Sequence, residues 1–150
     1  MTRRILPILA GLLAALLLAG CALLPAGEPD LAFEATVLAR PGEEQPIQIQ
    51  VGMRNEGDRP FAGDRLNGGA GSLTDASGRL LNEFTIQTLP SLDAGARTDL
   101  IGLGTALEPG EYALTWDAGE YGGVRVTFQI TDAGTAGWLE QQPLPAPAGV

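Results

Sequence analysis

The chain has 150 residues, and its nine basic residues, all of them arginine, are outnumbered by 18 acidic ones, for a formal charge of −9. This sign disfavours nucleic-acid binding, in which lysine and arginine replace the counterions of phosphates, and adsorption to anionic lipid. The chain also has no histidine, which removes the commonest general base and metal ligand. Without lysine or a G-x-S-x-G turn, we expect a protein that is not an enzyme and holds no metal or other cofactor.

Residues 1–20 have the three parts of a bacterial export signal. A cationic start, Arg3 and Arg4, precedes an apolar run that ends in small residues just before Cys21. The alternative is an uncleaved transmembrane helix, since a span needs roughly twenty apolar residues. Proline and glycine interrupt the run and favour the cleaved signal; they stand at Pro7, Gly11, Gly20 and Pro25.

The sequence Leu18-Ala19-Gly20-Cys21 resembles the lipobox of bacterial lipoproteins and stands at the distance from the N-terminus that this family uses. The resemblance implies that the Cys21 thiol accepts a diacylglyceryl group, that a peptidase cuts after Gly20, and that the new amino group can be acylated. Two or three acyl chains, at about 0.8 kcal/mol per buried methylene, hold a protein stably at a bilayer. The only cysteine of the chain falls at this position, so the motif is specific.

The lipobox resemblance sets the expected location and the first partner. We expect a lipid bilayer to hold the chain through acylated Cys21, with the domain in the cell envelope and facing outward from the cytoplasm. Ala22, and not aspartate, follows the cysteine. By the same resemblance this favours the outer membrane if the organism has one.

The chain from Cys21 onward carries seven arginines against 18 acidic residues, a charge of −11. Its 130 residues suffice for one domain. Residues 21–30 are expected to form a lipidated tether, and residues 31–132 the folded domain. Residues 133–150, which contain Pro143, Pro145 and Pro147, are expected to form a proline-rich flexible tail.

Apolar residues recur at every second position through residues 31–132, which is typical of strands with one buried face. The clearest run is Val124, Val126, Phe128 and Ile130. Similar alternation occurs at residues 31–37, 47–53, 84–86, 101–103 and 112–116. Residues typical of turns separate the runs. The sequence therefore predicts an all-β fold, an immunoglobulin-like antiparallel β-sandwich of about seven strands.

Three segments follow one another in an order that resembles a known family. They are residues 47–58 (IQIQVGMRNEGD), 73–80 (LTDASGRL) and 107–114 (LEPGEYAL). The succession is similar to the bacterial intracellular proteinase inhibitor (BsuPI-type) domain over residues 33–131. The resemblance implies the same sandwich fold. The export signal departs from a family whose name implies an intracellular protein, and no inhibitory residue can be carried over.

The longest irregular segment, residues 56–73, is the candidate contact loop. It carries Arg59, Phe61, Arg65 and Leu66, and long loops on rigid sandwiches often bind partners. The alternative is that Phe61 begins a weak strand and lies in the core. The acidic residues Glu56, Asp58, Asp64 and Asp75 do not match an EF-hand loop and alternate with arginines, so a solvated loop is favoured over a calcium site.

The predicted function is a non-catalytic binding or assembly module of the cell envelope, whose second partner is another envelope protein. The alternative is a proteinase inhibitor of the BsuPI-like type. The glycines at residues 67–71 are expected to make the neighbouring loop floppy, whereas a tight inhibitor gains affinity from a preorganised loop. This counts against the alternative.

Overall fold

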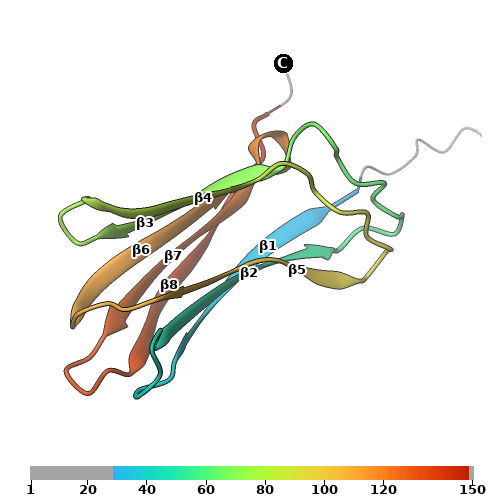
Figure 1. Cartoon of the computed structure of the whole chain (residues 1–150). Coiled ribbons are helices and arrows are strands. Elements are labelled where there is room, and N and C mark those ends of the chain that lie inside the picture. Colours follow the sequence, from blue (N-terminus) through green and yellow to red (C-terminus); the bar gives the residue numbers. More distant parts are fainter. Residues whose placement is uncertain (1–28, 149–150) are drawn as a thin grey trace, which may run out of the picture.

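A computed structural model describes residues 29–148 of the chain. These residues form eight strands and one short 3₁₀ helix (Figure 1): β1 (Leu31–Ala39), β2 (Ile47–Asn55), β3 (Gly69–Asp75), β4 (Leu80–Ile86), β5 (Arg97–Thr105), β6 (Gly110–Asp117), η1 (Gly119–Tyr121), β7 (Gly123–Ile130) and β8 (Ala136–Leu144). Within this range no helix has the length and apolar composition needed to cross a membrane.

The strands form two antiparallel sheets that pack face to face (Figure 1). One sheet has the order β1-β2-β5, and the other has the order β4-β3-β6-β7-β8. In immunoglobulin terms these orders correspond to strands A-B-E and C′-C-F-G, with β8 added beside G. The protein is therefore an all-β, immunoglobulin-like sandwich, as the alternation predicted.

The alternating residues form the core between the sheets. In β7, Val124, Val126, Phe128 and Ile130 are at most 2 % exposed, while the residues between them point outward. The inward residues of β2 and β6 are buried in the same way. The buried residues of β1, β2, β3, β6 and β7 thus form one shared core, and partly buried residues of β4 and β5 pack against it.

The predicted flexible tail is wrong over β8, which pairs with β7 from Ala136 to Leu144 and raises the strand count to eight. Proline content suggested disorder, but Pro143 lies in an edge strand that, among the described residues, pairs only with β7. An edge strand tolerates proline because one side of its backbone has no partner to lose. Beyond β8, the described residues 145–148 have no regular secondary structure.

Two of the glycines expected to make a floppy loop, Gly69 and Gly71, instead lie in β3. A Cβ at Gly71 would collide with the ring of Phe84, and one at Gly69 with the ring of Trp116. Phe84 and Trp116 stack with their ring centroids 6.1 Å apart. The glycines are therefore required by close packing, and the prediction of local flexibility is wrong.

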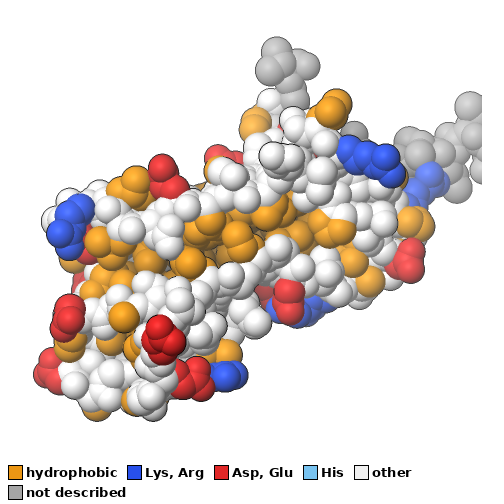
Figure 2. Space-filling view, in the orientation of Figure 1, with side chains coloured by type: hydrophobic (Ala, Val, Ile, Leu, Met, Phe, Trp, Pro, Cys, Tyr) orange, Lys and Arg blue, Asp and Glu red, His pale blue; other side chains and the backbone are white. Residues whose placement is uncertain are grey.

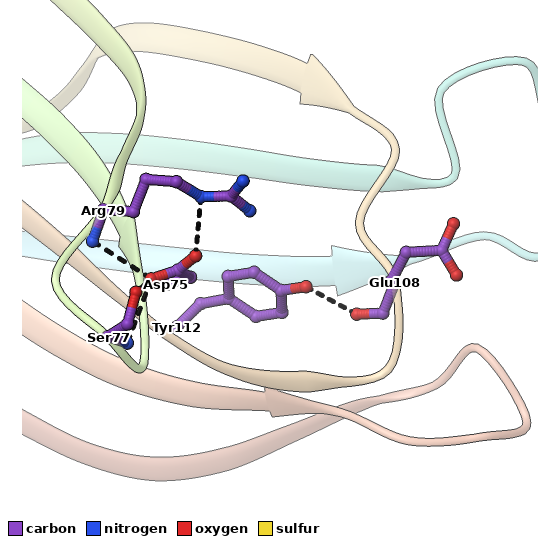
Figure 3. Close-up of polar contacts among 5 residues, drawn as sticks. All are labelled: Asp75, Ser77, Arg79, Glu108 and Tyr112. Carbon is purple, nitrogen blue, oxygen red and sulfur yellow. Dashed lines mark hydrogen bonds and ion pairs between the residues drawn. The ribbon is translucent and has the colours of Figure 1, made fainter.

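A tyrosine corner joins β6 to the segment before it (Figure 3). The hydroxyl of Tyr112, near the start of β6, donates a hydrogen bond to the carbonyl oxygen of Glu108 at 2.6 Å. The same arrangement marks strand F of immunoglobulin-like domains. Burial raises the pKa of Tyr112, so its hydroxyl remains a donor at neutral pH.

The antiparallel order places the loops at two opposite poles of the sandwich. The pole at which β1 begins, here called the entry pole, also carries residues 56–68, 87–96, 118–122 and the end of β8 (Figure 1). The far pole carries residues 40–46, 76–79, 106–109 and 131–135. The candidate contact loop therefore lies where the chain enters the domain.

Candidate functional site

The predicted lipidation site, Cys21, and the lipobox residues Leu18, Ala19 and Gly20 lie outside the described residues. The described chain begins at Pro29, and β1 begins at Leu31, ten positions after Cys21. An extended chain of that length spans at most about 35 Å. If Cys21 is anchored, the entry pole is held within that distance of the bilayer surface.

Because β3 begins at Gly69, the contact loop in the structure comprises residues 56–68. A second segment at the same pole, residues 87–96, holds it in place. Two isolated antiparallel bridges join them, Phe61 with Leu92 and Asp64 with Leu89. Each bridge has two backbone hydrogen bonds of 2.8 to 2.9 Å. The contact loop is thus ordered by backbone pairing, although neither segment is a full strand.

Phe61 belongs to the core. It is 5 % exposed, and its ring packs edge-on against Tyr121 with the ring centroids 5.3 Å apart. The prediction that Phe61 is a contact residue is wrong, and the alternative that it lies in the core is confirmed. Its aromatic ring fills the end of the sandwich below the loop.

Asp64 is the polar centre of the loop. Its Oδ1 accepts hydrogen bonds from the backbone N–H groups of Leu66 and Asn67 at 2.8 and 3.0 Å. Its Oδ2 accepts bonds from the Asn67 amide and the Tyr121 hydroxyl at 3.1 and 2.9 Å. The bonds from Leu66 and Asn67, more than that from Tyr121, lower the pKa of Asp64 to about 2.

Asn55 fixes the start of the loop. Its side chain is fully buried, and its amide donates to the carbonyl oxygens of Arg59 and Leu92 at 2.6 and 3.2 Å. Its Oδ1 accepts a hydrogen bond from the N–H of Gly57 at 3.1 Å. A buried amide with three partners defines the exit angle of the chain from β2.

The remaining predicted contact residues lie at the surface of this loop. Leu66 is 90 % exposed, the highest value among the exposed large apolar side chains of residues 29–148, and Arg59 and Arg65 are also exposed. Leu66 and Arg65 directly follow Asp64, whose hydrogen bonds hold this turn. The structure thus presents an apolar side chain beside an arginine on a fixed support.

Sequence reasoning missed the residues that build the support. Asp64 followed by Leu66-Asn67 has the form of an Asx turn, a local signal that could have been found. The contribution of Tyr121 could not have been found from the sequence, because this residue lies 57 positions from Asp64. The pairing of residues 87–96 with the loop left no periodic pattern in the sequence.

The acidic residues considered for calcium do not share a site. Asp64 lies at the entry pole, whereas Asp75 lies at the other end of β3 in its own turn (Figure 3). There the Asp75 carboxylate accepts bonds from Ser77 Oγ at 2.6 Å and from Arg79 Nε at 2.9 Å. Across residues 29–148 no three Asp, Glu, His or Cys side chains gather as metal ligands.

A cleft of about 680 Å³ lies at the entry pole between the two ends of the described chain. The start of β1 forms one wall, and residues 143–146 at the end of β8 form another; Tyr121 reaches it from the hairpin. Its charged lining residues are Asp30 and Glu120, both acidic. The cleft therefore offers no positive charge to an anionic ligand.

The sandwich architecture defines the class of this protein, an immunoglobulin-like β domain, and comparison with known proteins adds no family. No protein-family model and no curated protein matches the chain. A solved Bordetella pertussis protein with the provisional name ApaA is similar at 16 % identity and a TM-score of 0.45, over 83 % of this chain and all of that one. A structural-genomics target has 12 % identity and a TM-score of 0.37, over 80 % and 88 %. At these TM-scores neither likeness bears on function.

Proposed function

We propose that this chain is a lipid-anchored lipoprotein of the cell envelope that acts there as a non-catalytic binding or assembly module. The observation that carries the anchoring part is the position of Cys21. The single cysteine of the chain ends a lipobox-like sequence after an export-type signal. An acyl anchor then holds an acidic, soluble sandwich at the bilayer surface.

The binding part of the proposal is supported by the loop of residues 56–68. A solvent-exposed leucine next to an arginine, on a loop held by backbone pairing and by Asp64, suits a protein contact. Arginine and large apolar residues are common anchors of interfaces. A partner of this surface would be another protein of the envelope near the membrane, since the loop lies at the entry pole.

Labelling with radioactive palmitate tests the anchor. The full chain, expressed in a bacterium, should take up label and lose residues 1–20, while Cys21→Ser should do neither. A matched control, Cys21→Ser combined with Ser77→Cys, restores a thiol in the exposed turn at residues 76–79 and should also remain unlabelled. Equal labelling of the parent and Cys21→Ser would contradict the proposal.

A photo-crosslinker tests the contact loop. Placed at Leu66 in whole cells, it should give one discrete product with another envelope protein. The same crosslinker at Leu38, which is 43 % exposed on β1, is the matched control and should not give that product. Equal products from both positions, or none from Leu66, would count against the loop.

A proteinase inhibitor is a second candidate, favoured by the order of this loop. The expected floppiness was an argument against inhibition, and the pairing of residues 56–68 with 87–96 removes it. A preorganised loop loses less entropy on binding, and Arg65 is exposed next to its tip. Stoichiometric inhibition of a panel of serine proteases would support this candidate, and rapid cleavage after Arg65 would remove it.

A further inference from the structure

The two long sides of the sandwich differ in how they are closed. On one side β1 packs against β7 and β8, and the N–H of Ala35 in β1 donates to Oε1 of Gln141 in β8 at 3.3 Å. On the other side β4 and β5 do not pack against each other in this way. We call this second side, between β4 and β5, the open edge.

Burial falls at the open edge although the residues there are apolar. Ile49 and Val51 of β2 are 1 % exposed, but their partners in β5, Leu103 and Ile101, are only half-buried. The inward residues of β4 are also half-buried, whereas the central inward residues of β3 and β6, such as Leu73 and Leu114, are fully buried. Figure 2 shows a band of apolar side chains between the two sheets.

The open edge exists because one strand of a seven-strand sandwich is missing. In such a domain a strand D pairs with strand E, which is β5 here. The chain between β4 and β5, residues 87–96, instead crosses the entry pole and pairs with Phe61 and Asp64. In the described residues, the backbone of β5 from Thr98 to Thr105 makes no hydrogen bond beyond its pairing with β2.

The edge of β8 contains proline, whereas that of β5 from Ile101 to Thr105 contains neither proline nor a charged side chain. β8 contains Pro143, Gln141 and Gln142, and the β1 backbone is contacted by Gln141. The nine residues of β5 contain no proline, and two of them are Gly102 and Gly104. Natural sheets usually protect exposed edges with proline, charge or a bulge. In β5 the charged residues and the register shift against β2 lie toward its start, so residues 101–105 are the template for another strand.

Charge at the open edge selects the partner. The nearby arginines are already paired, Arg79 with Asp75 and Arg97 with Glu34 and Asp99. Three further acids on or beside β4 and β5 have no ion pair among the described residues; they are Glu83, Asp93 and Glu108. A second copy of this chain, at −11 from Cys21 onward, would be repelled.

We propose that the open edge binds an extended segment of another protein, which adds to β5 as a strand and whose residues alternate between apolar and basic. Backbone hydrogen bonds to β5 supply affinity, and side chains at alternate positions supply specificity. The apolar ones fill the gap between β4 and β5, and the basic ones, which point away from the gap, suit the net negative charge of the domain. The inference rests on the proposed binding role but not on the lipid anchor.

Hydrogen exchange on the full chain in detergent micelles tests the proposal. The probe is a nine-residue peptide with valine and arginine at alternating positions, and its control has the same composition with the valines grouped. The alternating peptide should slow amide exchange in β5 by about tenfold or more and leave β8 unchanged. The proposal would be overturned by no slowing in β5 or by equal slowing with the grouped peptide. It would also be overturned if a higher protein concentration without peptide slowed exchange in β5, because a second copy of the chain would then be the partner.

Two substitutions give an independent measure. Leu103→Arg puts a charge at the half-buried side of β5 and should weaken peptide binding by about tenfold or more. Leu38→Arg, on the outer face of β1, is the control and should not. If Leu103→Arg unfolds the domain, amide exchange in β6 and β7 becomes fast and reveals it. The proposal is then tested by the exchange experiment on the parent chain alone. Neither measurement depends on acylation, so failure here leaves the anchor intact.

Discussion

The hydroxyl of Tyr121 donates a hydrogen bond to Oδ2 of Asp64 at 2.9 Å, although the two residues are 57 positions apart. The bond ties the loop of residues 56–68 to the hairpin between β6 and β7. Burial first, and then the bond to Asp64, raises the pKa of Tyr121 to about 12. The tyrosine therefore stays protonated, and the loop stays tied to the hairpin, across the physiological pH range.

Removal of the Asp64 carboxylate should loosen the contact loop without unfolding the sandwich. Asp64→Ala loses the acceptor of four hydrogen bonds, while the bridges to residues 87–96 remain. We expect limited trypsin digestion to cut after Arg65 about tenfold faster than in the parent. Asp58→Ala, which removes an exposed acid from the same loop, is the control; equal acceleration in both would contradict the role of Asp64.

Stability should fall in acid as two carboxylates become protonated. Asp64 and Asp75 have pKa values of about 2 in the fold, below their ordinary value of 3.8. A lowered folded pKa stabilises the protein fully above the unfolded value, and this stabilisation is lost as the pH falls toward 2. The urea midpoint should therefore drop between pH 4 and 2, and less so in Asp64→Asn and Asp75→Asn. If the urea midpoint of the double variant dropped as much as that of the parent, protonation of Asp64 and Asp75 would not be the cause.

The tyrosine corner should contribute measurably to stability. Tyr112→Phe keeps the ring against Phe128 but removes the bond to the Glu108 carbonyl oxygen. The expected loss in the free energy of unfolding is about 1 kcal/mol, read from urea denaturation with an unchanged slope. An unchanged midpoint would mean that the hydroxyl makes no net contribution.

The glycines of β3 and β5 should respond differently to the same substitution. Gly71→Ala places a Cβ against the Phe84 ring and should cost about 1–3 kcal/mol. Gly102→Ala, in β5, meets nothing within 4 Å and should be neutral or slightly stabilising. Thermal unfolding of the two variants side by side checks this, and equal shifts would contradict the packing argument.

The sequence predicted the fold wherever alternation was strong and local. The period-two runs became β7, β2, β1 and β6, because each buries one face against the opposite sheet. β8 was missed because Pro143 and small residues weaken its pattern, and its stability comes from pairing with β7. Gly69 and Gly71 suggested flexibility because composition does not reveal the rings that pack against them.

The candidate site was predicted only in part. The exposed Leu66, Arg59 and Arg65 lie on the loop named from the sequence, but Phe61 lies in the core. A phenylalanine at the end of a long loop has no local signal that separates an anchor from a core residue. The burial of Phe61 depends on residues 87–96, which pair with its backbone, and on Tyr121, which packs against its ring. Both are distant from Phe61 in the sequence.

The intact mass of the chain purified from bacterial membranes tests the lipid anchor most directly. We expect a chain that begins at Cys21, lacks residues 1–20, and carries a diacylglyceryl group on the Cys21 sulfur. A chain that retains residues 1–20 and has an unmodified thiol would contradict the anchor, and with it the position of the contact loop beside the bilayer.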